Sequence, residues 1–388
     1  MKKIAIVRLS ALGDVIISAS MLGGGLEALR SKYGDVQIEW FVDERFAEIL
    51  RNSPCVAHLH ALPFKKWLKS PRGIYKIWRY MRSCGEYDIA IDMQGLLKSA
   101  LVGKALRARR FVGFSARGCR ERVASAFYTH KVDMPYDANI LVRNFALFAS
   151  VLGNSMEVNG DKDLESLECA IMESPTFQHF IALRGNSFGI DTQKLQCLSD
   201  DFASPALANP APCVNSVPCV NSAQTQTLKF LFILEASIAA KTYPIAQYCE
   251  LAEILRAHYP NIAIYIIWHS DEVGAESLRN ALESRQIRAI KLPRLDFNHI
   301  KFVLKNMDMV IGGDTGITHL AWAVGARSIV LLGNAPNTSG KNMSKTRLRR
   351  VLLGNPFVLS DSGEFEIASI APNRIFERIK AELGEKHG

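Results

Sequence analysis

IAIVRLSALGD, residues 4–14, is an apolar run that ends in a glycine and an aspartate, the pattern of a buried strand that passes into a helix. GGDTGITH, residues 312–319, repeats that pattern in the second half of the chain. In open α/β sheets, ligands bind in the crevice at this end of the strands. Helix N-termini there present unpaired N–H groups to anions such as phosphate. The two stretches therefore suggest one active site divided between two domains, suited to group transfer from a phosphate-linked donor.

Apolar runs alternate with stretches of helical period in both halves, which favours parallel α/β units. The predicted strands are 4–9, 38–42, 88–92, 111–114, 230–234, 263–268, 309–311 and 328–332. The predicted helices are 74–81, 96–106, 245–257 and 317–324. Gly325 is a natural C-cap for the last of these, and Pro244 fits a first helical turn. We therefore expect an α/β chain with two Rossmann-like domains.

Residues 154–228 interrupt the alternation. The pentapeptide PCVNS occurs twice there, at 212–216 and 218–222, amid Ser, Asn, Gln and Thr. This composition is typical of a low-complexity surface insertion or linker, and a metal clip through Cys213 and Cys219 is the weaker alternative. The domains are then expected at 1–153 and 229–372. The last segment, 373–388, has a helical pattern and is a candidate to pack back across the domain boundary.

Composition narrows the class of protein. The chain has 388 residues, 48% of them hydrophobic, and a net charge of +9. Residues 1–150 contain 24 Lys and Arg against 13 Asp and Glu, so the first half holds the whole positive excess. That asymmetry indicates an anionic partner such as a nucleic acid, an acidic membrane surface or a phosphorylated glycolipid. An ordinarily basic soluble surface is the alternative.

The eight cysteines show no C-x-x-C and no zinc-like spacing, which predicts a reduced, cytosolic chain without a structural metal. The apolar start is too short for a signal peptide. With no run of about 18 apolar residues, a spanning helix is not expected. Any membrane contact would then be peripheral.

Two basic runs in the first half contain almost no acidic residues. The run 65–82 interleaves Lys and Arg with Trp67, Tyr75, Trp78 and Tyr80, and the run 98–122 contains only Glu121 as an acid. Basic residues beside Trp and Tyr suit an anionic membrane interface. They also suit single-stranded nucleic acid. A solvated helix face is a weaker explanation, because such faces normally mix charge signs.

Asp14 and Asp314 are the candidate chemical groups. Asp14 follows the first strand and could serve as a general base for an attacking hydroxyl; the alternative is a helix N-cap. Asp314, Thr315 and Gly316 precede a helix whose first N–H groups would be free, and Gly316 would let a diphosphate approach the backbone. His319 lies one turn into that helix, where a buried, structural histidine is the alternative.

Other candidates lie in loops of the second half. Lys241, before the helix that follows Pro244, could neutralise a phosphate, and Ser237 could add a hydroxyl donor. Asp271 follows a strand and could bind a ribose diol, or could simply be a turn residue. GGGLEA, residues 23–28, satisfies G-x-G-x-x-A, but it comes some ten residues after the first strand, so we expect no NAD site.

Several motifs together resemble the inverting ADP-heptose glycosyltransferases of lipopolysaccharide core synthesis, most of all the type that adds the first heptose. They are SALGDV at 10–15, DMQGLLKSA at 92–100, KTYP at 241–244, LPRL at 292–295 and GDTGITHL at 313–320. The resemblance covers about residues 1–150 and 229–385. It implies a GT-B fold, in which two Rossmann-like domains with parallel sheets face a central cleft, and no metal or other cofactor.

The resemblance also implies roles for particular residues. Asp14 would be the base that activates the acceptor hydroxyl. The ADP-heptose donor would be held by Ser237, Lys241, Asp271, Leu295, Asp314, Thr315, Gly316 and His319. The acceptor, a Kdo sugar on lipid A, would be held by Lys65, Lys66, Gln94, Lys98 and Arg120. The protein would then work on the cytoplasmic face of the inner membrane, as a peripheral protein without a nucleic-acid partner.

The sequence departs from the family pattern in three places. Residues 18–21 lack the proline often found after the Gly-Asp, and Gly23–Gly25 weaken that helix. The usual Gly-Pro-Thr-Asp/Asn-Pro reads GNAPN at 333–337, and the acidic loop reads WHSDE at 268–272, so either Asp271 or Glu272 could bind the ribose. Two alternatives stay open: transfer of the second heptose, and a non-catalytic protein that binds an anionic glycolipid or nucleic acid.

Overall fold

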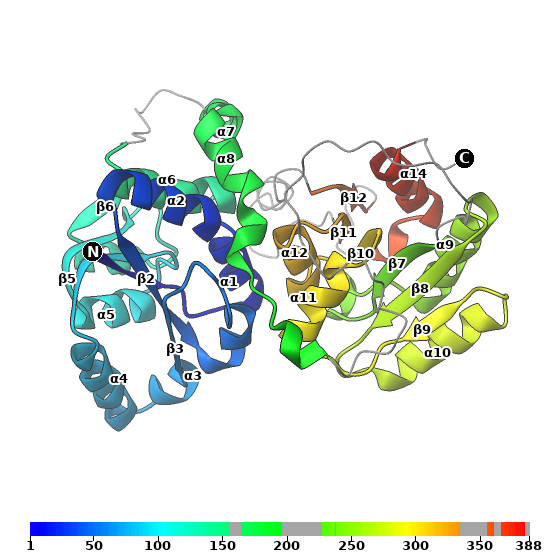
Figure 1. Ribbon diagram of the computed structural model, residues 1–388, viewed down its shortest axis with the longest axis horizontal. Helices are drawn as coiled ribbons and strands as arrows, with labels where there is room; N and C mark the ends of the chain where they lie inside the picture. The colour runs from blue at the N-terminus through cyan, green and yellow to red at the C-terminus, as the bar shows by residue number, and fades with distance from the viewer. Residues whose placement is uncertain (155–163, 196–226, 237, 334–354, 361–365, 385–388) are drawn as a thin grey trace.

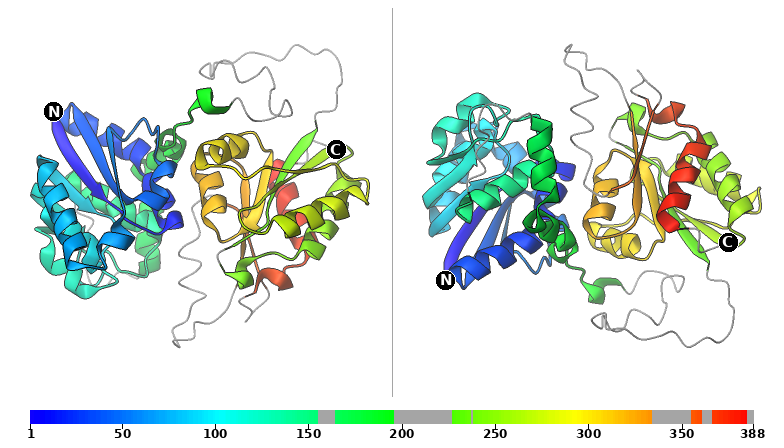
Figure 2. Two further views of the ribbon diagram at one scale, coloured as in Figure 1. Left: turned by 90° about the horizontal axis from the view of Figure 1, so that it is seen from below. Right: turned by 90° about the horizontal axis from the view of Figure 1, so that it is seen from above.

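The computed structural model describes residues 1–154, 164–195, 227–236, 238–333, 355–360 and 366–384. These residues form two α/β domains side by side (Figure 1). Each contains a six-stranded sheet whose neighbouring strands all pair in parallel, with helices on both faces (Figure 2). The two parallel sheets confirm the prediction of two Rossmann-like domains.

The N-terminal sheet has the strand order β3-β2-β1-β4-β5-β6. Its strands are β1 (Lys2–Val7), β2 (Val36–Asp43), β3 (His58–Leu62), β4 (Glu86–Asp92), β5 (Arg107–Phe114) and β6 (His130–Val132). Its helices are α1 (Leu12–Ala19), α2 (Leu22–Tyr33), α3 (Phe64–Trp67), α4 (Pro71–Ser83), α5 (Leu97–Ala105) and α6 (Ile140–Val151), with 3-10 turns η1 (Glu44–Ile49) and η2 (Arg122–Phe127).

The C-terminal sheet repeats this order as β12-β11-β10-β7-β8-β9. Its strands are β7 (Leu228–Ile233), β8 (Ile262–Ile267), β9 (Ala289–Lys291), β10 (Met309–Gly313), β11 (Ser328–Leu332) and β12 (Phe357–Leu359). Its helices are α9 (Ile245–His258), α10 (Glu272–Glu283), α11 (Phe297–Lys305), α12 (Gly316–Ala323) and α14 (Pro372–Leu383), with the short 3-10 turn η7 (Ala239–Lys241). Pro244 is the N-cap of α9 rather than a residue of its first turn.

The three glycines of α2 serve packing. A Cβ on Gly24 would lie 2.6 Å from the Cα of Phe180, and one on Gly25 would lie 2.7 Å from the ring of Phe148. Helix α8 (Pro175–Ala182), which supplies Phe180, can therefore approach α2 closely. This packing explains the glycine run at 23–25 without any dinucleotide.

Part of the expected insertion is folded. Helices α7 (Leu164–Glu173) and α8 pack on the N-terminal domain, with Phe177 and Phe180 fully buried beside Phe145. The expectation of a low-complexity insertion throughout 154–228 is therefore wrong for residues 164–195, because the aromatic side chains of α8 join the core of the N-terminal domain. Both copies of PCVNS lie outside the described residues.

The chain crosses between the domains over a segment that touches both of them. Ser187 is bonded to the N-terminal domain, since its Oγ accepts the N–H of Gly23 at 3.0 Å and its carbonyl accepts the Ser53 hydroxyl at 2.6 Å. Gly189 contacts both domains, since its carbonyl accepts from Nζ of Lys301 on α11 at 2.5 Å and a Cβ on it would lie 1.7 Å from the carbonyl oxygen of Asn52. Lys301 is fully buried and also reaches the carbonyl of Arg51. It therefore ties both domains to the crossing segment.

Helix α14 belongs to the C-terminal domain. It packs on α9, β11 and β12, and Ile375, Phe376 and Ile379 enter that domain's core (Figure 1). The sequence suggested that this segment crosses back to the N-terminal domain. It does not, because its apolar face is buried by α9 and the edge of its own sheet.

Helices α1 and α2 form one apolar stretch, Leu12–Tyr33, which by length and composition alone could cross a membrane. Of its most apolar window, 72% is buried inside the protein. A turn at residues 20–21 divides it into two helices. The stretch is thus explained as core of the N-terminal domain.

Candidate active site

The order of strands reverses at one place in each sheet, and loops diverge there to leave a crevice. In the N-terminal domain this switch point lies between β1 and β4, and in the C-terminal domain between β7 and β10. Residues 8–14 follow β1, and residues 314–319 follow β10. The two sequence motifs therefore occupy the switch points of the two domains.

The two switch points meet where α1 packs on α12. A Cβ on Gly316 would lie 2.6 Å from Cδ2 of Leu12, and one on Gly13 would lie 3.1 Å from Cδ2 of His319. In each helix, a glycine leaves space that a side chain of the other domain occupies. The expectation that Gly316 makes room for a diphosphate is corrected here, because Leu12 of the facing domain occupies the space beside its Cα.

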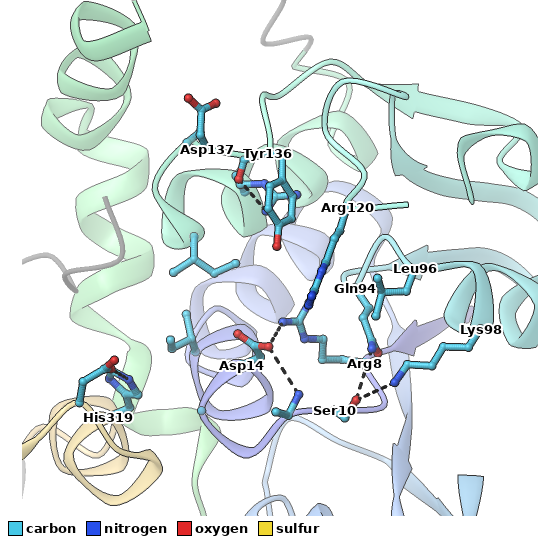
Figure 3. Close-up of a pocket in the computed structure, with 17 residues that line it drawn as sticks. Arg8, Ser10, Asp14, Gln94, Leu96, Lys98, Arg120, Tyr136, Asp137 and His319 are labelled. Carbon is cyan, nitrogen blue, oxygen red and sulfur yellow. Dashed lines mark hydrogen bonds and ion pairs between the residues drawn. The ribbon is translucent and has the colours of Figure 1, made fainter. Parts of the chain in front are cut away.

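A cavity of about 350 Å³ adjoins this contact (Figure 3). Both domains line it, the N-terminal domain with Asp14 and the C-terminal domain with Asp314 and His319. Of the predicted site residues, the cavity brings together Asp14, Gln94, Lys98, Arg120, Asp314 and His319.

Asp14 lies in the first turn of α1, three residues after the N-cap, which is Ala11. Its Oδ2 lies 3.0 Å from the Arg8 guanidinium and accepts the N–H of Ala11 at 3.5 Å. About half of its side chain, 49%, is exposed toward the cavity. Asp14 is therefore an accessible carboxylate held at a helix N-terminus, where negative charge is stabilised.

Gln94, in the loop after β4, and Lys98, in the first turn of α5, converge on Ser10 (Figure 3). Nζ of Lys98 donates to the Ser10 hydroxyl at 3.1 Å, and Nε2 of Gln94 does so at 3.4 Å. Oε1 of Gln94 accepts the N–H of Leu9 at 2.9 Å. The loops after β1 and β4 are thereby fixed relative to each other, with an ammonium group at the cavity wall.

Buried Asp92 shapes the loop that contains Gln94. Its carboxylate accepts the N–H groups of Gln94 and Gly95 and the hydroxyls of Ser99 and Tyr128, at 2.8–3.2 Å. Burial raises the pKa of Asp92, against the lowering effect of these four hydrogen bonds. Sequence reasoning placed Asp92 only in a motif and missed this positioning role.

Two buried arginines that sequence reasoning did not identify as site residues also line the cavity. Arg8 and Arg143 are 4% and 6% exposed. Arg143 donates to the carbonyls of Gly118 and Tyr136 and lies 4.5 Å from the centre of the Phe114 ring. Burial lowers the pKa of Arg143 to about 10, so it stays charged at neutral pH. The sequence signal that could have identified Arg143 is its position as a lone arginine in the apolar segment 140–151.

Arg8, Lys98, Arg120 and Arg143 are the lysine and arginine side chains that line the cavity, and all four come from the N-terminal domain. The acids that line it are Asp14, Asp137 and Asp314. Asp14 is paired with Arg8, and Asp314 is paired with residues of its own domain. The cavity is therefore suited to a ligand that is itself negatively charged.

Lys65 and Lys66 are not part of this lining. Both lie on α3 at the protein surface, and the N–H of Lys65 donates to buried Asp43 at 2.8 Å. Their side chains are exposed, so the structure leaves them as surface cations of the N-terminal domain.

Asp314 is the hub on the C-terminal side. Its Oδ2 lies 2.5 Å from Nζ of Lys241, and its Oδ1 lies 3.0 Å from Nε2 of His319. Burial alone would raise the pKa of Asp314, but the hydrogen bonds and charges of His319 and Lys241 hold it well below the ordinary range. Asp314 is thus an ionised anchor that orients Lys241 and His319, rather than a proton acceptor.

Thr315 is the N-cap of α12. Its hydroxyl accepts the N–H of Thr318 at 3.4 Å, and the Thr318 hydroxyl donates to the carbonyl of Gly313 at 2.7 Å. A helix that begins at Gly316 presents its first amide groups at the switch point, next to Lys241. Together these groups are a suitable cradle for a diphosphate.

A second cavity of about 460 Å³ lies at the ends of β7 and β8. Leu295 lines it, as do Trp268 and His269 of the acidic loop. Glu235, which sequence reasoning missed, accepts the N–H groups of Ser270 and Asp271 at 2.9–3.1 Å and fixes that loop.

Asp271 and Glu272, the two candidates for the ribose, are both engaged elsewhere. Asp271 is the N-cap of α10 and accepts the N–H of Gly274 at 2.8 Å, while Glu272 lies 3.3 Å from Lys291. Neither lines the second cavity. Asp271 is therefore a capping residue in this structure, and Ser237 lies outside the described residues.

Within the described residues, no group of three or more His, Cys, Asp or Glu side chains is arranged to hold a metal ion.

Two facing Rossmann-like domains with a carboxylate and a diphosphate cradle at their switch points are the architecture of a GT-B glycosyltransferase. A family model described as glycosyltransferase family 9 (heptosyltransferase) matches residues 74–347. The chain belongs to this family, and it is a glycosyltransferase.

Individual relatives agree. Lipopolysaccharide heptosyltransferase 1 of Campylobacter coli is 28% identical, over 99% of this chain and 100% of its own. The structure of E. coli heptosyltransferase WaaC with ADP-2-deoxy-2-fluoro heptose covers 98% of this chain and 99% of its own, with a TM-score of 0.66 at 21% identity. The structure of E. coli ADP-heptose lps heptosyltransferase II covers 99% and 98%, with a TM-score of 0.60 at 16% identity. The solved structures support the fold.

Proposed function

We propose that this protein transfers a heptose from ADP-heptose to a Kdo residue of lipid A, with inversion at the anomeric carbon. The observation that carries the proposal is the shared cavity, in which Asp14 of one domain and the Asp314–His319 turn of the other line the same space. An acceptor hydroxyl and a sugar diphosphate can meet there. The names of the family and of the C. coli relative support the sugar and the pathway.

The reaction is a single displacement. Asp14 accepts the proton of the acceptor hydroxyl as that oxygen forms a bond to the anomeric carbon. The bond from the anomeric carbon to the diphosphate breaks on the opposite face, and its electron pair leaves with ADP. One displacement inverts the configuration, in contrast to the two steps of retaining carboxylate enzymes. Lys241 and the first amides of α12 stabilise the charge of the departing diphosphate.

The cations of the first cavity are assigned to the acceptor. Kdo is an acidic sugar, and a carboxylate suits the forked donors of Arg120. Arg8 and Arg143 add positive charge at the wall, while their terminal nitrogens are engaged by protein partners. Lys98 and Gln94 fix Ser10 at the same wall. Lys65 and Lys66 lie on the surface of the same domain, where we assign them to the approach of the anionic lipid.

The donor is assigned to the C-terminal domain. Lys241, Thr315, Gly316 and His319 surround the diphosphate and the sugar, and Leu295 contacts the nucleoside. Asp271 is left out of the donor site, because its carboxylate caps α10.

We also propose that the protein binds the cytoplasmic face of the inner membrane through α4, α5 and η2. These elements adjoin one another, and six of their apolar side chains are exposed: Ile74, Tyr75, Trp78, Leu97, Leu101 and Val123. Basic side chains of residues 65–82 and 98–122 surround them. Aromatic and basic side chains on one surface suit anionic lipid headgroups.

The deciding experiment is mass spectrometry of the product formed from purified protein, ADP-heptose and Kdo-lipid A. We expect one added heptose per acceptor and stoichiometric release of ADP over many turnovers. If product forms only when the acceptor already contains one heptose, the protein adds the second heptose instead. Saturable binding of the acceptor without any release of ADP would contradict the proposal.

A further inference from the structure

The second cavity is built by both domains. Its C-terminal-domain wall comes from the ends of β7 and β8 and from the segment 295–300, and its other wall comes from η1 and α1 of the N-terminal domain. The apolar side chains that line it include Leu12, Phe46, Ile233, Ile267, Leu295 and Ile317. Charged side chains also line it: Glu44, Arg45, Glu48, Arg51, Glu235 and Asp296. A cavity that combines apolar walls with polar groups suits a heteroaromatic ring and its attached sugar.

The position of this cavity relative to the first one fits a divided donor. Leu12 and Ile317 line the second cavity, while their neighbours Gly13 and His319 line or adjoin the first. The α1–α12 contact is therefore the partition between the two spaces. A nucleotide sugar whose diphosphate sits at the N-terminus of α12 has its sugar on the Asp14 side and its nucleoside on the other.

Phe46 is placed at the N-terminal-domain wall by η1. The guanidinium of Arg45 lies 4.9 Å from the centre of the Phe46 ring and 2.6 Å from the carboxylate of Asp43. Asp43 is buried, caps η1 and also accepts the N–H of Lys65. η1 in turn packs on α11 of the facing domain. The backbone that bears Phe46 is thus anchored from both domains, with the partly exposed ring at the cavity.

We propose that Phe46 is a specificity-determining residue for the donor, as the N-terminal-domain wall of the nucleobase pocket opposite Leu295. This inference rests on the proposed function, because it takes the donor to be a nucleoside diphosphate sugar. If Phe46 has this role, the domain that binds the acceptor also contacts the nucleobase of the donor. Selection of the nucleotide then depends on both domains being together.

Titration of the full-length protein with ADP and with inorganic pyrophosphate tests this inference. Removing an aromatic wall of a base pocket weakens binding by about tenfold. We therefore expect Phe46→Ala to raise the Kd for ADP by about tenfold, to leave the Kd for pyrophosphate unchanged and to reduce the preference for ADP over UDP. Phe46→Trp should retain ADP binding. Val273→Ala, an exposed change on α10 outside the lining of both cavities, is the control.

Two results would overturn the inference. One is an unchanged Kd for ADP in Phe46→Ala. The other is an equal loss of ADP and pyrophosphate binding, which would mean that the variant disturbs the fold or the α12 cradle. Failure of the proposed function is distinguishable from both, because in that case the wild-type protein itself neither binds ADP nor transfers heptose.

Discussion

The guanidinium of Arg8 lies 3.0 Å from Oδ2 of Asp14, and Arg8 is buried while half of Asp14 is exposed. The N–H of Ala11 also donates to Oδ2. Within the described part of the chain, Oδ1 is therefore the oxygen available to a substrate hydroxyl. The ion pair orients the Asp14 carboxylate, so the geometry of the proposed base depends on Arg8, which lies in the core.

Asp14→Asn tests the general base. The amide keeps the shape of the side chain but accepts a proton poorly, so kcat should fall by about 10²- to 10⁴-fold. The Kd for ADP-heptose should change by less than about threefold, because the diphosphate cradle lies on the other domain. Stopped-assay kinetics and a binding titration measure the two quantities. Wild-type turnover in this variant would exclude Asp14 as the base.

Lys241→Ala should weaken donor binding as well as rate. The ammonium is one of two partners of Asp314, at 2.5 Å, and the proposed partner of the diphosphate. Loss of one charge-assisted hydrogen bond, about 1.5–3 kcal/mol, corresponds to roughly 10- to 100-fold in kcat/KM. Lys291→Ala, which removes a lysine of the same domain paired to Glu276, is the control. Unchanged KM and kcat would remove Lys241 from the site.

Gly316→Ala should hinder closure of the cleft. The new methyl group would lie 2.6 Å from Leu12 of the facing domain, and such overpacking costs about 1–3 kcal/mol. We expect lower kcat/KM, with recovery in the double variant Gly316→Ala/Leu12→Ala. A cycle of the four proteins measures the coupling. Additive losses would show that the α1–α12 contact does not limit activity.

Lys301→Met should change how stability depends on pH. Burial lowers the pKa of Lys301 to about 8, against 10.5 for an exposed lysine. Between these pKa values the unfolded chain binds more protons than the native protein. This group therefore increases the free energy of unfolding as the pH rises. Below about pH 8 that contribution is constant.

Denaturant unfolding of wild type and Lys301→Met at pH 7 to 9.5 measures this contribution of Lys301 to the free energy of unfolding. Wild type should gain about 1–3 kcal/mol relative to Lys301→Met over this range. Lys131→Met, on an exposed side chain, should parallel wild type. Parallel curves for wild type and Lys301→Met would contradict the expectation.

The double variant Tyr75→Ala/Trp78→Ala tests the membrane surface. The two rings stack with centroids 6.0 Å apart and are 59% and 46% exposed. Loss of two interfacial aromatic side chains should weaken cosedimentation with anionic vesicles by about tenfold or more. Val273→Ala, 82% exposed on the other domain, is the control. Equal binding of wild type and the double variant would place the membrane contact elsewhere.

Long apolar strands were predictable, and short edge strands were not. The eight predicted strands all exist, because central strands buried on both faces read as continuous apolar runs. The strands β3, β6, β9 and β12 were missed. They are edge or near-edge strands of three to five residues, and β3 and β6 contain His or Lys, so their sequences lack a clear period.

The site was predictable where its residues are close in sequence to a strand end. Asp14, Gln94, Asp314 and His319 follow β1, β4 and β10 and meet in one cavity. Arg143 was missed because it lies on α6, far in sequence from the strand ends that mark the site. Asp271 was proposed as a ligand of the ribose, whereas in the structure its carboxylate caps α10. Whether a carboxylate caps a helix or binds a ligand depends on its distance to the nearest backbone amide, and that distance is set by the fold.

The crossing from Ser187 to Gly189 has a mechanical consequence. Ser187 is bonded to Gly23 and Ser53 on one side, and Gly189 to Lys301 on the other. Arg184, before this crossing, already donates to the carbonyl of Trp322 in the C-terminal domain, and Gly189, after it, still lies against Asn52 of the N-terminal domain. The segment therefore fastens the two domains together on both sides of the buried Phe188, and any change in the angle between them has to break contacts at both ends of it.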